Sequence, residues 1–328
     1  MGLPLELIAP AGNPAALRAA VDAGADAVYV GFRDATNARN FPGLNFSRDE
    51  IAAGLAYAHA RGTRVFIAIN TFPRAGARAP WLAAIDDAAG LGADAIILAD
   101  IGLLDYAAGR HPGLRRHLSV QASASSPEAI HFFAHRFGVR RVVLPRVLTI
   151  EEITRLNAEI SVETEVFAFG GLCVMAEGRC SLSSYAAGRS PNLDGVCSPA
   201  EAVAYERDGG DMVSKLAGLT INRFPEGEPA GYPTLCKGRF SARGRRSYLF
   251  EEPTSLNTLD LLPELAAAGV AALKIEGRQR GRAYVAEVVK TFRKAIEGIG
   301  AAAAGAAGLA AVSEGARQTY GVYRKTWR

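Results

Sequence analysis

The sequence is poor in cysteine and in long apolar runs, and both shortages limit what the protein can be. It has four cysteines among 328 residues. The longest weakly apolar stretch, residues 298–312, is mostly alanine and glycine and is too short to span a bilayer. The N-terminus shows no basic region before an apolar segment, so we predict no signal peptide. We therefore expect a soluble cytoplasmic protein, in which thiols indicate metal or redox chemistry more than disulfides.

Several catalytic signatures are also absent. The chain has no P-loop and no glycine-rich dinucleotide turn. His131 and His135 lie four residues apart but lack the H-E-x-x-H carboxylate, so we interpret them as an exposed helix face. Ser123, Ser125 and Ser126 lack the G-x-S-x-G context of a nucleophile, and helix capping explains them better. The 37 basic and 33 acidic residues are interspersed, so the net charge of +4 does not indicate nucleic acid.

Short β-branched runs alternate with amphipathic stretches, which is the pattern of βα units. We predict strands at Glu6–Ala9, Ala27–Gly31, Val65–Asn70, Ala95–Asp100, His117–Gln121, Arg141–Pro145, Glu165–Phe169 and Ala272–Glu276. We predict helices at Pro14–Ala23, Ser47–Arg61, Pro80–Leu91, Ile101–Gly109, Pro127–Phe137, Thr149–Glu159 and Arg282–Glu297. The strands are apolar at successive positions, as in parallel strands that are buried on both faces. This α/β pattern favours a TIM-like (β/α)₈ barrel over the alternative, a doubly wound open sheet.

The spacing of the strands indicates an insertion. The first seven strands begin 21 to 38 residues apart, whereas the step from the seventh to the eighth exceeds 100 residues. All four cysteines fall within that step. We therefore predict a barrel over residues 1–297 that includes a cysteine-bearing insertion at 170–255 after the seventh strand. An Ala/Gly-rich C-terminal extension follows at 298–328. We predict little regular structure within the cysteine segment.

Polar side chains follow the predicted strands, at the end where barrel enzymes carry their active sites. Catalytic residues are not identifiable from the sequence, but this rim supplies candidates for substrate binding. They are Arg39, Asn70, Gln121, Arg146, Glu276 and Arg278.

The cysteines form a candidate metal site. Cys173, Cys180, Cys197 and Cys236 are separated by six, sixteen and thirty-eight residues. Structural zinc sites usually contain two short C-x₂₋₄-C knuckles, which are absent here. An iron–sulfur cluster accepts irregular spacing, because each thiolate binds a separate iron. The residues alone leave three alternatives open, namely iron–sulfur, zinc, and four buried, inert thiols.

Several stretches resemble a known family. ELIAPAG (6–12), GADAVYVG (24–31), NARNF (37–41) and KIEGRQR (274–280) are similar to motifs of the collagenase-like peptidases. The segment EVFAFGGLCVMAEGRCSLSSYAAG, together with GVCSPA and CKGRF, resembles one branch of that family. This branch, the UbiU proteins, acts in oxygen-independent ubiquinone biosynthesis. The resemblance extends over the whole chain.

The resemblance implies a cofactor, partners and a reaction. Cys173, Cys180, Cys197 and Cys236 match the ligands of a [4Fe-4S] cluster in that branch. It implies a heterodimer with the paralogue UbiV and cooperation with a sterol-carrier-like lipid-binding accessory protein. The implied reaction is hydroxylation of the aromatic ring of a prenylated ubiquinone precursor without dioxygen.

Prephenate is a candidate oxygen donor, and the guanidiniums of Arg39, Arg146 and Arg278 are candidates to bind its carboxylates. We expect no nucleic acid partner. The alternatives are an RNA-hydroxylating relative, as in sister branches, or a peptidase of the same family. The residues offer the peptidase no nucleophile and no protease metal motif.

Overall fold

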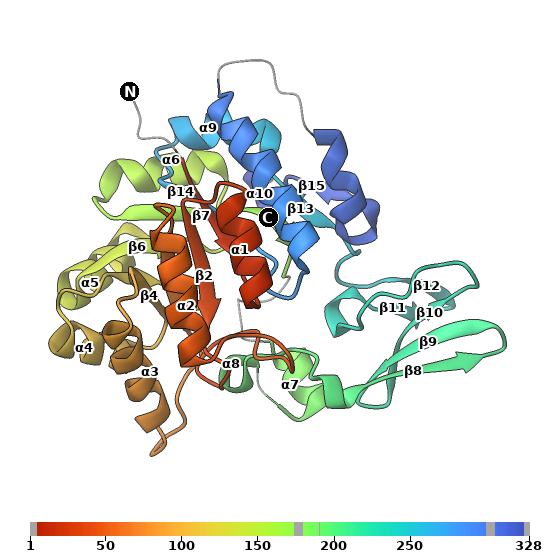
Figure 1. The fold of residues 1–328 in the computed structure, drawn as a ribbon. Coiled ribbons are helices and arrows are strands. Elements are labelled where there is room, and N and C mark those ends of the chain that lie inside the picture. The colour runs from red at the N-terminus through yellow and green to blue at the C-terminus, as the bar shows by residue number, and fades with distance from the viewer. Residues whose placement is uncertain (1–4, 174–179, 190, 300–305, 325–328) are drawn as a thin grey trace.

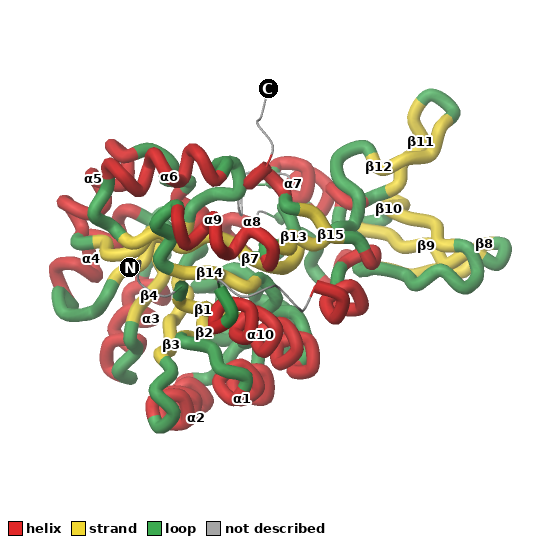
Figure 2. The backbone as a smooth tube through the Cα atoms, turned by 90° about the horizontal axis from the view of Figure 1, so that it is seen from above, coloured by secondary structure: helices red, strands yellow, loops and turns green. Residues whose placement is uncertain are grey.

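The chain is built around a closed parallel barrel (Figures 1 and 2). A computed structural model describes residues 5–173, 180–189, 191–299 and 306–324. The barrel strands are β1 (Glu6–Pro10), β2 (Ala27–Gly31), β3 (Arg64–Ile69), β4 (Ala95–Leu98), β5 (Arg116–Leu118), β6 (Val139–Val143), β7 (Glu163–Gly171) and β14 (Ala272–Ile275). β14 pairs in parallel with both β1 and β7, which closes the ring. The predicted TIM-like barrel is confirmed.

Helices cover the outside of the barrel. They are α1 (Pro14–Asp22), α2 (Arg48–His59), α3 (Ala79–Gly90), α4 (Ile101–Arg110), α5 (Pro127–Phe137), α6 (Ile150–Glu159), α9 (Leu262–Ala267) and α10 (Arg282–Glu297). Ser47 and Thr149 form capping boxes with Glu50 and Glu152 at the starts of α2 and α6. Each box satisfies backbone N–H groups that the helix itself leaves unpaired.

The fifth strand is shorter than predicted. We expected a strand over His117–Gln121, but β5 ends at Leu118 and a 3₁₀ turn, η1 (Val120–Ala122), follows it. The Ser119 side chain accepts a hydrogen bond from the backbone N–H of Gln121 and so caps this turn. A similar cap shortens the fourth strand, because the Asp100 side chain accepts from the N–H of Leu103 at the start of α4.

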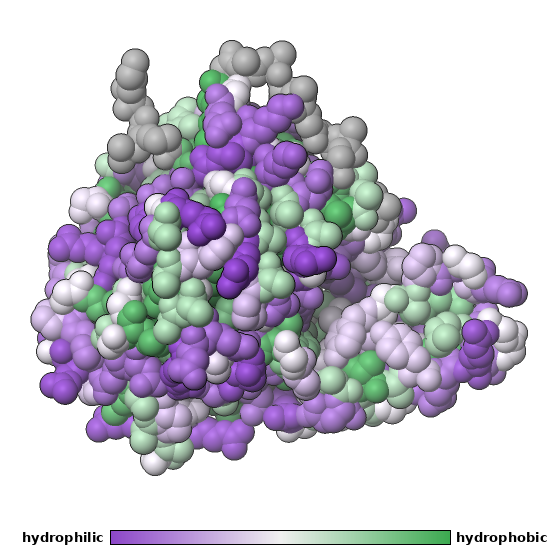
Figure 3. Space-filling model, viewed as in Figure 1, coloured by the Kyte–Doolittle hydropathy of each residue, from purple (hydrophilic) through white to green (hydrophobic). Residues whose placement is uncertain are grey.

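The segment after β7 contains more regular structure than predicted. Two short helices, α7 (Ser181–Ala187) and α8 (Pro191–Asp194), are followed by an antiparallel sheet of β8 (Val203–Asp208), β9 (Asp211–Leu216) and β10 (Leu219–Phe224). A hairpin of β11 (Arg239–Ala242) and β12 (Arg245–Tyr248) lies beside it. The prediction of little regular structure was wrong, because local hairpin pairing stabilises this segment. The strands β8 to β12 project from the barrel as an arm (Figures 2 and 3).

The C-terminal residues return to the barrel. β13 (Ser255–Asn257) pairs antiparallel with the end of β7, and β15 (Gln318–Thr319) pairs in parallel with β13. Tyr323 is buried, and its hydroxyl donates to the Phe167 carbonyl across 2.7 Å. Tyr323 therefore anchors the segment that carries β15 to strand β7.

The apolar core fills the space between the strands and the helices. A smaller cluster, which includes Ile8, Phe66 and Ile97, fills the inside of the barrel. No helix among the described residues is both long enough and apolar enough to cross a membrane.

Candidate functional site

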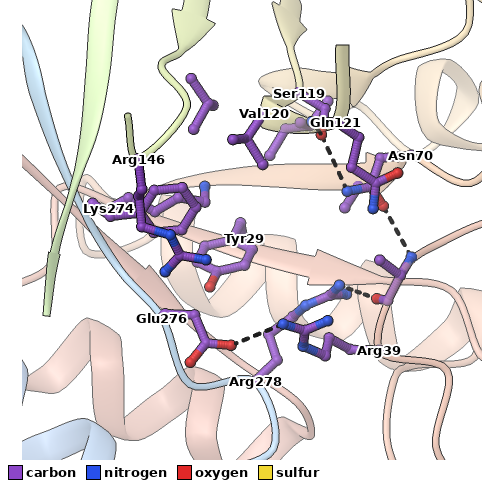
Figure 4. Close-up of a pocket in the computed structure, with 15 residues that line it drawn as sticks. Tyr29, Arg39, Asn70, Ser119, Val120, Gln121, Arg146, Lys274, Glu276 and Arg278 are labelled. Carbon is purple, nitrogen blue, oxygen red and sulfur yellow. Dashed lines mark hydrogen bonds and ion pairs between the residues drawn. The ribbon is translucent and has the colours of Figure 1, made fainter. Parts of the chain in front are cut away.

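A cavity opens at the carboxyl ends of the barrel strands (Figure 4). It encloses about 660 Å³, counted with its open mouth. Its lining residues are Tyr29, Ala38, Arg39, Ala68, Asn70, Ile97, Ser119, Val120, Gln121, Val143, Arg146, Phe167, Lys274, Glu276 and Arg278. All six candidate substrate-binding residues are therefore brought to one cavity, although they follow five different strands, β2, β3, β5, β6 and β14.

Among the residues that the structure describes, four cations and one carboxylate line the cavity, so this lining is electropositive. A guanidinium nitrogen of Arg39 lies 3.4 Å from Glu276 Oε1. Burial raises the pKa of the Glu276 carboxyl, but the charges of Arg39 and Arg146 outweigh burial and hold that pKa below its usual value. Glu276 is thus a carboxylate, and it neutralises only part of the positive charge around it.

Arg278 organises the loop that carries Arg39. Its guanidinium donates to Asn37 Oδ1 across 2.9 Å and to the Ala38 carbonyl. Gly31 makes this contact possible, because a Cβ there would lie 2.4 Å from Asn37 Oδ1. Burial lowers the pKa of Arg278 to about 10. Arg278 lines the cavity, but its donors bind the protein, so its main role is to hold the loop.

Asn70 also holds this loop. Its Oδ1 accepts from the N–H of Ala38 across 3.0 Å, and its Nδ2 donates to Ser119 Oγ across 3.3 Å. Gln121 is buried, and its Oε1 has no hydrogen-bond partner in the described structure. A buried acceptor without a partner costs free energy. A ligand that enters the cavity and donates a hydrogen bond to this oxygen would remove that cost.

Arg146 connects the cavity to the cysteine segment. Its guanidinium lies over the Phe167 ring, 4.2 Å from the ring centre, and donates to the Gly171 carbonyl across 2.7 Å. Gly171 ends β7, two residues before Cys173. The neighbouring Gly170 has a left-handed φ of 121°, and a Cβ there would lie 2.6 Å from the Glu276 carbonyl oxygen. β7 therefore passes close to the loop after β14.

The floor of the cavity contains two polar side chains that our sequence reading missed. Lys274 and Tyr29 lie within strands β14 and β2 and point into the barrel. Lys274 Nζ donates to Glu165 Oε1 across 2.7 Å and lies 3.9 Å from the centre of the Tyr29 ring. The Tyr29 hydroxyl donates to the Ile275 carbonyl. We overlooked these residues because each is a single polar or aromatic position inside an apolar run.

The four cysteines are half-buried, and none forms a disulfide. Cys180 precedes α7, and its sulfur accepts from the N–H of Ser183 across 3.3 Å. α7 packs against η3 (Leu235–Lys237), the turn that carries Cys236. Burial raises the pKa of the Cys236 thiol, and the charge of Cys197 raises it further. These three thiols therefore share one region of the insertion.

Cysteine thiols with nearby cations are the donors that an iron–sulfur cluster uses, so the chemistry of the set fits one. Among the residues that the structure describes, no three His, Cys, Asp or Glu side chains converge as a group that could hold a metal ion. Lys237, next to Cys236, pairs with Glu314, which also accepts from Arg280 across 3.1 Å. Glu314 thereby joins the cysteine segment to the loop after β14.

The other polar candidates lie elsewhere. His131 and His135 stack on α5 with 5.7 Å between their ring centres. Ser126 caps α5 through the N–H of Ala129, which confirms its capping role. Within the described part of the chain, no histidine lines the cavity, and the one serine of its lining, Ser119, accepts hydrogen bonds from Asn70 and from the Gln121 N–H. The cavity therefore lacks a nucleophile–base pair of the serine hydrolase type.

The family follows from comparison with known sequences. A model of peptidase family U32 matches residues 12–320. The chain belongs to this family. This U32 protein is 32% identical over 311 residues to tRNA hydroxylation protein P of Escherichia coli, covering 89% of the chain and 68% of that relative.

Other relatives carry different names. The chain is 29% identical to 23S rRNA 5-hydroxycytidine C2501 synthase of Escherichia coli, covering 90% of the chain and 40% of that protein. It is 29% identical to a collagenase of Porphyromonas gingivalis, covering 89% of the chain and 65% of that protein. This U32 protein thus spans about two thirds or less of the length of these relatives. The solved structure of the U32 peptidase Mk0906 aligns with a TM-score of 0.48 at 17% identity, covering 84% of this chain and 94% of that one.

Proposed function

We propose that this protein acts in the oxygen-independent hydroxylation of the aromatic ring of a ubiquinone precursor, as a UbiU-like member of family U32. Relatives named as tRNA and rRNA hydroxylation proteins support a hydroxylation role within the family. The sequence around the four cysteines resembles the UbiU branch of the family, and this resemblance supports a role in ubiquinone biosynthesis. In this proposal the chain works as a heterodimer with UbiV and receives the prenylated substrate from a sterol-carrier-like protein.

The observation that carries the proposal is the electropositive cavity beside the cysteine segment. Arg39 and Arg146 present guanidiniums to it, and Glu276 compensates only one of its positive charges. Guanidiniums bind carboxylates through paired, charge-assisted hydrogen bonds. The cavity therefore suits a small carboxylate-bearing oxygen donor such as prephenate. A donor bound there would contact Arg146, which in turn contacts the end of β7 near Cys173.

We propose Cys173, Cys180, Cys197 and Cys236 as the thiolates that hold a [4Fe-4S] cluster. When bound, such a cluster would supply one-electron redox chemistry. The residues of the chain bind and orient the donor. Arg146 and Arg39 hold the carboxylates of the oxygen donor, and Gln121 Oε1 accepts a hydrogen bond from a hydroxyl of that molecule. Phe167 and Tyr29 form the apolar walls of the cavity.

The decisive experiment measures ubiquinone in a deletion strain of the source organism grown without oxygen. We expect ubiquinone to be lost and to return with the wild-type gene. It should not return with Cys197→Ser or Arg146→Gln, whereas Arg140→Ala, a change at an exposed position on β6, should restore it. Normal ubiquinone in the deletion strain would overturn the proposal.

The cluster has its own measurement. Protein purified without air should contain iron and sulfide at about four each per chain and show a thiolate-to-iron absorption band. Cys197→Ser and Cys236→Ser should remove both signals. A wild-type protein that stays colourless after anaerobic reconstitution would exclude the cluster.

Two other functions make different predictions. An RNA-hydroxylating protein, as the names of two relatives suggest, would lose a modified nucleoside in the deletion strain while ubiquinone stayed normal. A peptidase, as the collagenase name suggests, would cleave protein substrates without iron. The composition of the cavity disfavours the peptidase, since the lining residues that the structure describes include no histidine or cysteine.

A further inference from the structure

Lys274 is a buried lysine that lines the cavity and has no role in the proposal above. The sequence contains six lysines. Five of them lie in the described residues, and of these Lys274 alone is buried, with 7% of its surface exposed. Lys290 and Lys294, on α10, are exposed. A lysine is costly to bury, so its position at the floor of an open cavity calls for a reason.

The amine of Lys274 has a defined set of neighbours. Glu165 Oε1 lies 2.7 Å away and is fully buried, on the adjacent strand β7. The face of the Tyr29 ring lies 3.9 Å away, on the side of β2. Glu165 Oε2 accepts no hydrogen bond within the described structure and lies 3.5 Å from a guanidinium nitrogen of Arg141. The amine thus has one carboxylate partner with spare acceptor capacity.

The surroundings of Lys274 favour a reactive amine. Burial lowers the pKa of Lys274; Glu165 works in the opposite direction, and the positive charges of Arg278 and Arg141 lower that pKa further. The pKa therefore falls below that of an exposed lysine. Enzymes activate lysine nucleophiles in this way, by burial and by nearby cations.

The cavity also defines the kind of molecule that this amine would meet. Arg146 stacks on Phe167, which pairs with Lys274 in register between β7 and β14. Figure 4 shows the Arg146, Lys274 and Tyr29 side chains around the same space. A guanidinium binds a carboxylate, and an amine attacks a ketone or aldehyde carbon. An α-keto acid carries both groups on adjacent carbons.

We propose that Lys274 is a catalytic residue that forms an imine with the ketone of an α-keto acid whose carboxylate is held by Arg146. The assignment rests on the proposed function in one respect, namely that a carboxylate-bearing donor enters this cavity. The assignment goes beyond the proposed function because it states that the protein forms a covalent bond with the ketone of this molecule.

The step balances without an oxidant or a reductant. Glu165 accepts a proton from the Lys274 ammonium, and the neutral amine adds to the carbonyl carbon. The carbon–nitrogen bond forms, and the carbonyl oxygen takes up two protons, one from Glu165 and one released by the added nitrogen. That oxygen leaves as water. The product is a protonated imine, which makes the adjacent carbons of the keto acid electron-poor and so more reactive.

Trapping by reduction tests the proposal directly. The full-length protein is incubated with pyruvate or phenylpyruvate and sodium cyanoborohydride, digested, and analysed by mass spectrometry for reduced adducts at each lysine. We expect labelling of Lys274 to exceed that of Lys290 and Lys294 by roughly tenfold or more, because positioned groups raise the effective concentration of the ketone. Lactate and phenyllactate, which lack the ketone, should give no adduct.

Variants separate the roles of the groups. Lys274→Arg keeps the charge beside Glu165 and should abolish the adduct at this position, while Lys290→Arg should leave Lys274 labelling unchanged. Arg146→Gln should lower labelling by pyruvate by roughly tenfold, the loss expected for one charge-assisted hydrogen bond. Because the wild-type digest alone identifies the labelled lysine, the test does not depend on a variant that folds. Labelling of Lys274 that does not exceed that of the exposed lysines would overturn the proposal.

The test is independent of the proposed hydroxylation, since trapping needs no iron, no partner and no quinone. A trapped Lys274 in a protein whose deletion leaves ubiquinone normal would refute the proposed function and retain this assignment. An untrapped Lys274 in a protein whose deletion abolishes ubiquinone would do the reverse.

Discussion

Arg278 and Asn37 are 241 residues apart in the sequence, yet the Arg278 guanidinium donates to Asn37 Oδ1 across 2.9 Å in the buried interior. The same guanidinium donates to the Ala38 carbonyl. The contact joins the loop after β2 to the loop after β14, two strands that are separated by β1 in the barrel. Arg39, which faces the cavity, is therefore positioned by a residue that follows the last strand of the barrel.

This contact predicts a large loss of stability in Arg278→Ala. The change leaves Asn37 and the Ala38 carbonyl buried without their donor, and we expect the free energy of unfolding to fall by about 3 kcal/mol or more. Urea denaturation followed by circular dichroism measures the loss. Arg140→Ala, at an exposed position, should change the unfolding free energy by less than about 0.5 kcal/mol. A similar loss in both variants would contradict the role assigned to Arg278.

His117 predicts a decline in stability toward mildly acid pH. This side chain is fully buried, and its Nε2 accepts from Arg115 across 3.0 Å. Burial, with the charges of Arg141 and Arg115, holds the pKa of His117 well below its usual value of 6.5. Below pH 6.5 the unfolded chain therefore binds a proton at this histidine that the folded chain does not bind. Stability should fall as the pH is lowered through this range, by up to about 1.4 kcal/mol per pH unit.

The comparison with His117→Gln isolates this effect. Glutamine can still accept from Arg115 but does not titrate, so the variant should lose less stability than the wild type between pH 6.5 and pH 5. His135→Gln, on the exposed face of α5, should keep the wild-type dependence. Parallel pH profiles for the wild type and His117→Gln would show that the buried imidazole is not responsible.

Tyr323 predicts that the C-terminal residues contribute to barrel stability. Its buried hydroxyl donates to the Phe167 carbonyl on β7, whereas the hydroxyl of Tyr320 binds Asp260 on the surface. Tyr323→Phe should lower the unfolding free energy by about 1–2 kcal/mol, because the carbonyl loses a buried donor. Tyr320→Phe should cost less than about 0.5 kcal/mol. Thermal or urea unfolding measures both, and equal effects would argue against a specific anchor.

The proposed cluster predicts a difference in local order between the loaded and unloaded protein. Metal binding stabilises the segment that supplies the ligands, so removal of the cluster should speed proteolysis between residues 180 and 236. Limited proteolysis with mass spectrometry compares the anaerobically reconstituted protein, the chelated protein and the Cys197→Ser variant. Cleavage outside the insertion serves as the internal control. Equal cleavage rates in all three proteins would show that the insertion folds without the cluster, which would contradict this prediction.

The sequence by itself predicted the barrel and the edge at which the cavity lies. Parallel strands buried on both faces produce uninterrupted apolar runs, and helices between them carry recognisable caps such as Ser47 with Glu50. Polar residues directly after such runs lie at one edge, because the carboxyl ends of parallel strands meet there. For this reason Arg39, Arg146 and Glu276 could be placed at a common site before their positions were known.

Only the tertiary structure decided what individual side chains do at that edge. Lys274 appears in the sequence as one polar residue in an apolar strand, and its pairing with Glu165 depends on how β7 and β14 meet when the barrel closes. Arg278 looked like a donor for a ligand, but its hydrogen bonds hold the loop after β2. The Tyr323 anchor likewise depends on a contact between distant segments, because its hydroxyl donates to the Phe167 carbonyl. Local sequence patterns encode strands and caps, whereas closure of the barrel determines which groups meet.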